Sequence, residues 1–193
     1  MSTYPNAALL LSAAHPKHFP ADSGAEAAFA GRSNSGKSSA INALVGRRSL
    51  ARTAKTPGRT RLLNFFELLP GSRIVDLPGY GYAEASAAER ASWGPMISAL
   101  ATRASLRGLF LIVDSRRGLL EGDEALIEWA QAVNCPVHVL LSKSDKLKRA
   151  ELTKSLAAAK AALGGRATLQ AFSAVDGTGL EDARRQLHRW LQK

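Results

Sequence analysis

Short apolar runs alternate with amphipathic stretches along most of the chain. The continuous apolar runs at 26–30, 109–113 and 137–141 are typical of strands that are buried on both faces. Elsewhere apolar side chains recur every three or four residues, which indicates amphipathic helices. The complete set of expected elements is strands over 26–30, 61–69, 72–76, 109–113, 137–141 and 167–172, and helices over 37–45, 89–104, 121–134, 149–163 and 179–191.

The order of these elements predicts the fold class. Strands that alternate with helices form a mainly parallel sheet with helices on both faces. The turn at Pro70 and Gly71 joins 61–69 to 72–76 as a hairpin, so one strand runs antiparallel to its neighbour. We therefore expect an α/β fold of three α-β-α layers around a mainly parallel six-stranded sheet with one antiparallel edge strand.

Two features depart from this regular pattern. Gly94 and Pro95 are expected to interrupt or kink the helix over 89–104. Residues 1–24 and 47–59 are rich in small, polar and basic residues, so we expect both stretches to be mobile. The prediction is an N-terminal extension over 1–24 and a single domain over 25–193.

Composition excludes several classes of protein. A chain of 193 residues with 46% apolar and 22% charged residues is neither wholly disordered nor fibrous. No apolar run approaches the ~20 residues that span a bilayer, and the first twenty residues lack the pattern of a signal peptide. We expect a cytoplasmic protein with no membrane partner. The single cysteine, Cys135, excludes an internal disulfide and a multi-cysteine metal site.

The charge of the chain is strongly basic and concentrated in one segment. The 26 Lys and Arg residues outnumber the 16 Asp and Glu residues, a net charge of +10 that favours a polyanionic partner. No acidic residue lies between Glu26 and Glu67. That interval is either a solvated basic face or a nucleic-acid contact, and its eight cations are Arg32, Lys37, Arg47, Arg48, Arg52, Lys55, Arg59 and Arg61.

One motif fits a phosphate-binding loop. The sequence GRSNSGKS matches G-x-x-x-x-G-K-[ST] and lies between a predicted strand and a predicted helix. Backbone amides and the helix N-terminus would surround the phosphates of a nucleotide, with Lys37 on the β- and γ-phosphates and Ser38 on Mg²⁺. An ordinary glycine turn is the alternative. The predicted nucleotide contacts in this loop are Gly31, Arg32, Ser33, Asn34, Ser35, Gly36, Lys37, Ser38 and Ser39.

A second motif supplies a carboxylate to the same nucleotide. Asp76 ends a predicted strand and begins the sequence DLPG, where Leu77, Pro78 and Gly79 follow it. Asp76 would act on Mg²⁺ and the Gly79 amide on the γ-phosphate. A second D-x-x-G occurs at 176–179, but only Asp76 follows an apolar run in the segment after the loop.

Two further segments at strand ends point to guanine recognition. Ser142, Lys143, Ser144 and Asp145 resemble [NT]-K-x-D. A carboxylate accepts hydrogen bonds from guanine N1–H and the 2-amine, which adenine lacks, and such mismatches discriminate by ~10⁴ or more. The alternative is a helix N-terminus with a capping Asp. The second segment, which resembles the loop that contacts guanine O6 in small GTPases, is Phe172, Ser173 and Ala174.

Together these segments carry a resemblance to a known family. GRSNSGKSS, KTPGRT, DLPGYGYA, SKSD and FSA, with WGPM and VDSRR between them, resemble the bacterial EngB (YihA/YsxC) ribosome-biogenesis GTP-binding proteins. The resemblance spans about residue 26 to the end and departs at Ser142, where the family usually has Thr. It implies a Ras-like P-loop G domain of the Era-related class, a monomer that hydrolyses GTP. It also implies association with the large ribosomal subunit, through rRNA or ribosomal protein, and a link to septation and cell division.

The resemblance also assigns the switch residues. It implies that Thr60 binds Mg²⁺ when the γ-phosphate is present, with Gly58 and Arg59 beside the nucleotide, and Thr56 is the rival position. We assign catalytic roles to Lys37, Thr60 and Gly79.

The rate of hydrolysis is expected to be slow. In Ras-type enzymes a Gln orients the attacking water, whereas here Tyr80 follows Gly79. Either a partner surface or a monovalent cation would complete the site. Era-related GTPases that use K⁺ resemble this chain in having Asn at the position of Asn34, whose alternative role is a hydrogen bond within the loop.

Two alternative functions would also use the phosphate-binding loop. A nucleotide kinase is one, although the sequence has no evident lid of clustered arginines. An RNA-binding module with a structural nucleotide is the other, and it would bind RNA equally with GTP, GDP or neither.

Overall fold

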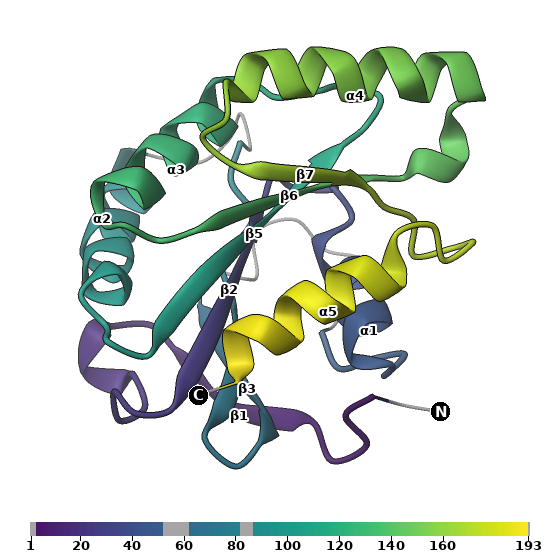
Figure 1. Cartoon of the computed structure of the whole chain (residues 1–193). Helices are drawn as coiled ribbons and strands as arrows, with labels where there is room; N and C mark the ends of the chain where they lie inside the picture. Colours follow the sequence, from purple (N-terminus) through teal and green to yellow (C-terminus); the bar gives the residue numbers. More distant parts are fainter. Residues whose placement is uncertain (1–2, 52–61, 82–86, 193) are drawn as a thin grey trace.

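The computed structural model describes residues 3–51, 62–81 and 87–192, with the side chains of 87–93 excepted. A seven-stranded sheet runs through the molecule in the order β1-β3-β4-β2-β5-β6-β7 (Figure 1). Its strands are β1 (Ala8–Ala13), β2 (Ala25–Gly31), β3 (Leu63–Leu69), β4 (Ser72–Asp76), β5 (Leu106–Asp114), β6 (Val137–Ser142) and β7 (Thr168–Ala171). The helices are α1 (Lys37–Val45), α2 (Ala87–Ala101), α3 (Glu121–Ala132), α4 (Arg149–Leu163) and α5 (Leu180–Leu191), with short 3-10 turns η1 (Pro16–His18) and η2 (Ser144–Lys146).

The predicted fold class is confirmed. Strands β4, β2, β5, β6 and β7 run parallel, and β3 runs antiparallel to β4. Because the side chains of a strand alternate between faces, β5 contributes side chains to two hydrophobic cores, one on each face of the sheet. Phe110 and Ile112 pack with α1 and α5, whereas Leu109 and Leu111 pack with α2, α3 and α4. These are the three expected layers (Figure 1).

The sheet has one strand more than the sequence predicts. Strand β1 lies within residues 1–24, which we expected to be mobile, and it pairs antiparallel with β3 at the edge of the sheet. The last residue of β1, Ala13, is buried in the core, while Leu9 and Leu10 earlier in the strand are exposed. The count of six strands is therefore corrected to seven, and two antiparallel pairings, β1 with β3 and β3 with β4, lie at one side of the sheet.

Helix α2 is not interrupted. It runs through Gly94 and Pro95 to Ala101, so the predicted interruption is wrong, while the alternative of a kink stays a prediction. A proline removes one backbone donor from a helix, but Met96 and Leu100 in the following turn are buried in the core and hold that half of the helix in place. Among the described residues, the helices are too short or too polar to cross a bilayer.

The parallel strands end at one edge of the sheet. Several predicted boundaries there match the structure, including the start of α1 at Lys37 and the end of β4 at Asp76. In open α/β sheets ligands bind outside the carboxyl ends of the strands. The segments predicted to bind a nucleotide follow β2, β4, β6 and β7 and so meet at this edge.

Candidate nucleotide-binding site

In the described part of the chain, the loop between β2 and α1 leaves a helix N-terminus without a side-chain cap. Gly36 is the N-cap residue in a left-handed conformation (φ 96°), makes no side-chain cap, and no acidic residue stands in the first turn of α1. The first amides of a helix have no intrahelical acceptor and carry the positive end of the helix dipole. This arrangement fits an anion such as a nucleotide phosphate.

Gly31 allows the loop to fold back on the sheet. A Cβ atom at this position would lie 2.6 Å from Ser35 Oγ and 2.7 Å from the carbonyl oxygen of Ile112. The loop therefore approaches β5 more closely than any larger residue at 31 permits.

Lys37 and Asp76 form an ion pair at the start of α1. Their side chains are only 11% and 10% exposed. Burial raises the pKa of Asp76, while the adjacent Lys37 ammonium and a hydrogen bond from Asn64 oppose that shift. The predicted phosphate lysine and the predicted Mg²⁺ carboxylate are thus brought together, and Ser38 follows Lys37 on the same helix. Hydroxyl and carboxylate oxygens suit Mg²⁺, which is commonly held by one or two protein groups and by phosphates.

Gly79 lies against the phosphate loop. A Cβ atom on Gly79 would stand 3.3 Å from Ser33 Cα, and the Leu77 amide donates to the Phe29 carbonyl at 2.9 Å. The rival D-x-x-G match lies elsewhere, because Asp176 is exposed in the loop before α5 and accepts the Thr178 amide at 2.9 Å in a local turn.

The two segments predicted to recognise guanine meet directly. The Ser144 amide donates to the Phe172 carbonyl at 3.2 Å, and Ser173 Oγ donates to Asp145 Oδ1 at 2.8 Å. Asp145 also pairs with Lys146 at 3.0 Å. The Ser173 hydrogen bond, followed by that of Lys146, lowers the pKa of Asp145, so the carboxylate is ionised and able to accept hydrogen bonds at neutral pH.

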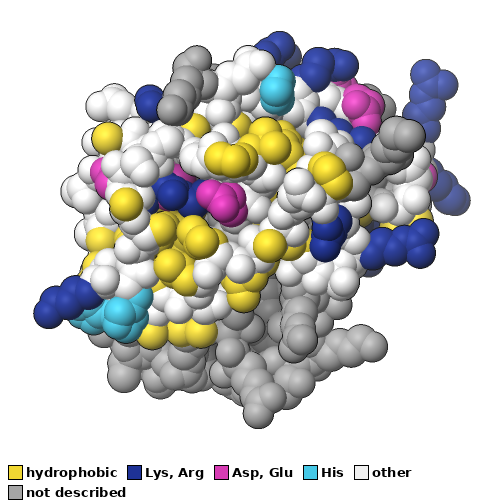
Figure 2. Space-filling model, turned by 90° about the horizontal axis from the view of Figure 1, so that it is seen from below, with side chains coloured by type: hydrophobic (Ala, Val, Ile, Leu, Met, Phe, Trp, Pro, Cys, Tyr) yellow, Lys and Arg dark blue, Asp and Glu magenta, His cyan; other side chains and the backbone are white. Residues whose placement is uncertain are grey.

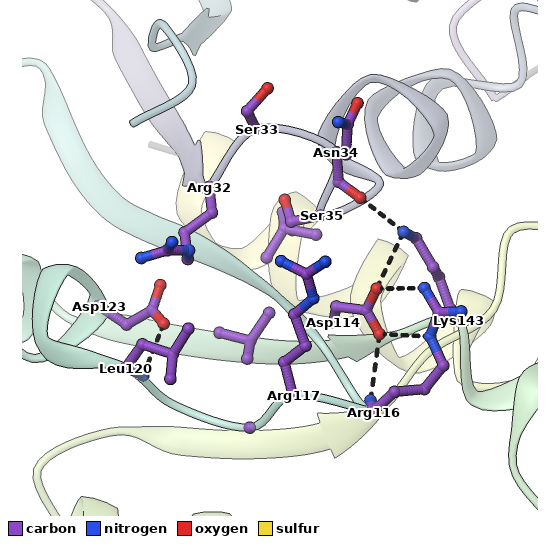
Figure 3. A pocket seen from close by; sticks show the side chains of 13 residues that line it. Arg32, Ser33, Asn34, Ser35, Asp114, Arg116, Arg117, Leu120, Asp123 and Lys143 are labelled. Atoms are coloured by element: carbon purple, nitrogen blue, oxygen red, sulfur yellow. Dashed lines mark hydrogen bonds and ion pairs between the residues drawn. The ribbon is translucent and has the colours of Figure 1, made fainter. Parts of the chain in front are cut away.

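Lys143 and Ser142 tie this region to the phosphate loop. Lys143 Nζ donates to the Asn34 carbonyl and to Asp114 Oδ2, the latter at 2.9 Å (Figure 3). Ser142 Oγ donates to the Ser35 carbonyl and contacts the Val113 carbonyl at 3.1 Å. The hydroxyl that Ser142 shares with Thr is therefore used within the protein.

Asp114 is a site residue that the motifs did not identify. Burial opposes its ionisation, but hydrogen bonds from Arg116 and Lys143 bring the pKa of Asp114 well below its ordinary range. The sequence offered one signal, an apolar run that ends on an aspartate, but spacing alone does not pair that aspartate with Lys143.

Tyr80 is joined to α3 by a contact that sequence reasoning also missed. The Tyr80 hydroxyl donates to Asp123, whose other oxygen accepts the Leu120 amide at 2.9 Å. The Tyr80 ring packs on Gly122, where a Cβ atom would lie 3.2 Å from it. Burial, followed by the charge of Asp123, raises the pKa of Tyr80. The phenol is thus neutral and engaged with Asp123.

Some predicted residues lie outside the described part of the chain. These are Thr60, its neighbours Gly58 and Arg59, and the rival Thr56. Asn34 is described and exposed, with a left-handed backbone (φ 63°). Its carbonyl accepts Lys143, and within the described residues its side-chain amide makes no hydrogen bond.

One edge of the parallel sheet holds a phosphate-binding loop, an adjacent carboxylate and two loops that are hydrogen-bonded to each other and predicted to recognise a base. This is the arrangement of a P-loop GTPase domain. A family model for 50S ribosome-binding GTPases matches residues 26–143. The probable GTP-binding protein EngB of Coxiella burnetii strain RSA 493 is 46% identical, over 98% of this chain and 94% of its own. That of Dechloromonas aromatica strain RCB is 48% identical, over 99% and 90%.

A solved structure agrees with these relatives. The crystal structure of a probable GTP-binding protein EngB superposes with a TM-score of 0.70 at 22% identity, covering 86% of this chain and 98% of that one, which shows the shared fold. The chain belongs to the EngB family of GTP-binding proteins.

Proposed function

We propose that this protein is a GTP-hydrolysing molecular switch that acts in assembly of the large ribosomal subunit. The observation that carries the proposal is the hydrogen bond from Ser173 to Asp145, which holds a carboxylate ready for a base at the same sheet edge as the uncapped N-terminus of α1. A carboxylate that faces N1–H and a 2-amine selects guanine over adenine.

Each predicted residue then has a role in the nucleotide complex. Lys37 leaves Asp76 and binds the β- and γ-phosphates, the first amides of α1 hold the phosphate oxygens, and the Gly79 amide contacts the γ-phosphate. Ser38, Asp76 and Thr60 would hold Mg²⁺, which when bound neutralises charge on the β- and γ-phosphate oxygens.

Hydrolysis by the isolated protein is slow in this proposal. Tyr80 holds the position of the water-orienting Gln, and its hydroxyl is bonded to Asp123. The missing stabilisation comes from the ribosomal partner or from K⁺. The side chain of Asn34, exposed and without a hydrogen bond in the described residues, supports the cation role.

The partner is the large ribosomal subunit, bound by a monomer in the cytoplasm. The family model describes 50S ribosome-binding GTPases, and a net charge of +10 suits contact with rRNA. The link to septation that the resemblance implies would follow from subunit assembly rather than from a separate site.

Cosedimentation with purified large subunits tests the switch. The protein is loaded with Mg²⁺ and a non-hydrolysable GTP analogue, with GDP, or with no nucleotide. We expect binding with the analogue and little with GDP, and Lys37→Ala should lose the nucleotide dependence because it loses the phosphate contact. Equal binding in all three states would reject the switch and favour an RNA-binding module.

A further inference from the structure

Three polar side chains lie in register across one side of the sheet. Strand β3 pairs antiparallel with β1 on one side and with β4 on the other, and β1 and β3 lie side by side in Figure 1. Ser12 of β1 stands opposite Asn64 of β3, and Asn64 stands opposite Asp76 of β4. Residues that are directly opposite on antiparallel strands point to the same face of the sheet. The three side chains therefore form a row that ends at Asp76.

This row faces helix α1. Residues two positions apart in a strand point to the same face. Phe66 lies two positions after Asn64 and packs in the core beneath α1, as does Ile74 of β4. The row thus points to the layer that holds Lys37, the residue that pairs with Asp76 at the start of α1. Asp76 is contacted by α1 on one side and by β3 on the other.

The amide of Asn64 matches the needs of both neighbours. An ionised carboxylate only accepts hydrogen bonds, so the NH₂ end of an amide is the end that can serve Asp76. Asn64 donates to Asp76. Its oxygen accepts the Ser12 hydroxyl, with 2.7 Å between Ser12 Oγ and Asn64 Oδ1. The hydroxyl therefore fixes which end of the amide faces the carboxylate.

The hydrogen bond from Asn64 matters most once a nucleotide is bound. In the proposed function Lys37 leaves Asp76 for the phosphates. Of the side chains that donate to Asp76 in the described part of the protein, Asn64 then remains. A buried carboxylate without a donor is costly. Hydrogen bonds to a carboxylate that binds a metal also orient it toward that metal.

We propose that Asn64 is the positioning residue of the Mg²⁺ carboxylate Asp76, and that Ser12 orients Asn64. Asn64 acts through Asp76 and touches neither the metal nor the nucleotide. The inference rests on the proposed function, because it takes Asp76 as the residue that acts on Mg²⁺. It adds strand β1, part of the predicted N-terminal extension, to the groups that determine the affinity for Mg²⁺.

The Mg²⁺ dependence of nucleotide release tests this role. The full chain is loaded with a fluorescent non-hydrolysable GTP analogue, and its release is followed over a series of free Mg²⁺ concentrations and in excess EDTA. Because Mg²⁺ joins phosphate oxygens to protein ligands, it should slow release, and the concentration for half of this effect reports the affinity for the metal. The rate in EDTA reports the contacts that need no metal.

Four variants are compared with the wild type. Asn64→Ala removes the donor to Asp76, and Ser12→Ala removes the hydroxyl behind it. Because Ser12 is exposed, Ser12→Ala keeps the test decisive even if Asn64→Ala does not fold. The matched control is Ser72→Ala, which removes a hydroxyl that contacts the Leu191 carbonyl at 3.4 Å at the opposite end of β4. Asp76→Ala tests the proposed metal site itself.

We expect the Mg²⁺ concentration for half of the effect to rise about tenfold in Asn64→Ala, the size of effect that partners of metal ligands have. It should rise about two- to threefold in Ser12→Ala, which loses one neutral hydrogen bond, and stay constant in Ser72→Ala. Release in EDTA should be the same in all of these proteins.

Other results would overturn the inference. If Asp76→Ala weakens the response to Mg²⁺ while Asn64→Ala and Ser12→Ala leave it unchanged, the positioning role is wrong and the proposed metal site stands. Faster release of Asn64→Ala in EDTA with an unchanged response to Mg²⁺ would show a merely structural role. A wild type whose release does not respond to Mg²⁺ would reject the proposed metal site and this inference together.

Discussion

Tyr80 contributes contacts to the fold at the position where, in the proposed function, a water-orienting side chain is missing. Its hydroxyl donates to Asp123 at the start of α3, and its backbone carbonyl accepts the Ser33 amide of the phosphate loop at 2.9 Å. The residue therefore connects the segment after Gly79 to both neighbouring elements. A side chain used in this way is not available to orient a water molecule.

Replacing Tyr80 by Phe separates these two roles. Tyr80→Phe removes a donor from a buried carboxylate, so we expect a loss of about 1–2 kcal/mol of unfolding free energy in urea. Single-turnover hydrolysis by the isolated protein should not change. A fall of roughly 100-fold, the size of a general acid–base contribution, would mean that the phenol acts on the reaction.

Asp22 gives a stability contribution that depends on pH. Hydrogen bonds from Ser105, its hydroxyl first and then its amide, and from the Ala104 amide lower the pKa of Asp22 from 3.8 to about 2. A carboxyl group whose pKa is lowered in the folded state stabilises the protein at pH values above its pKa in the unfolded state. This stabilisation is lost as the pH falls from about 4 to about 2.

The variant Asp22→Asn measures that contribution. At pH 6 the wild type should be more stable than Asp22→Asn, and the difference should shrink at pH 2.5, where the wild-type carboxyl is becoming protonated. Urea unfolding of both proteins at the two pH values gives the comparison. A difference that stays constant would mean that the charge of Asp22 does not contribute.

At the scale of elements, the sequence predicts what is local and misses what depends on distant partners. The start of α1 at Lys37 follows from a glycine loop between two apolar segments, and the structure has the same boundary. Strand β1 is different, because a short Ala/Leu run fits a helix as well as a strand. Its strand form depends on pairing with β3, some fifty residues further along the chain.

In the candidate site, too, the sequence predicts local features and misses contacts between distant residues. Motifs that are continuous in sequence, such as 31–38 and 142–145, identified the loops that meet at the sheet edge. The contacts Lys143–Asp114 and Tyr80–Asp123 join positions tens of residues apart, so no spacing rule could show them.

The docking of α5 on the sheet depends on Gly108. A Cβ atom there would lie 2.2 Å from the Trp190 ring, which is nearly buried and packs against Phe110 with ring centroids 4.7 Å apart. Gly108→Ala must displace the ring, and overpacking of this kind costs about 1–3 kcal/mol.

Gly94→Ala is the control for Gly108→Ala, because the same substitution is expected to stabilise the protein at this position. Among the residues whose side chains the structure describes, nothing lies within 4 Å of a Cβ atom at Gly94, inside α2. Gly94→Ala should raise the unfolding free energy by about 0.5–1 kcal/mol, because alanine has the higher helix propensity. Urea unfolding followed by circular dichroism gives both values, and a Gly108→Ala protein as stable as the wild type would contradict the described docking of α5.

At the scale of the whole molecule, the positive charge is not spread evenly. On the face seen in Figure 2, Lys and Arg side chains project mostly from the margins, and hydrophobic side chains gather in patches between them. Two cations of the interval between Glu26 and Glu67 have partners within the protein, since Lys37 pairs with Asp76 and Arg47 donates to the Pro5 carbonyl. Arg48 is exposed.

Salt dependence tests whether the basic interval contacts rRNA. Each phosphate contact that is lost should reduce the slope of log affinity against log salt by about 0.7–0.9. Changing Arg47, Arg48 and Arg52 together to Ala should therefore flatten the slope for large subunits. The matched control changes three exposed cations of α4, Arg149, Lys154 and Lys160, and should leave the slope unchanged. Equal slopes in all three proteins would support a solvated basic face.

In the proposed function Asp145 makes this a guanine-nucleotide site, and nucleotide selectivity tests that role most directly. Equilibrium affinities for GTP and xanthosine triphosphate are measured with Mg²⁺ for the wild type and for Asp145→Asn. The wild type should prefer GTP strongly, and Asp145→Asn should prefer xanthosine triphosphate, because an amide can donate to the 2-oxo group whereas a carboxylate cannot. An unchanged preference in the variant would contradict the role of Asp145 in base recognition.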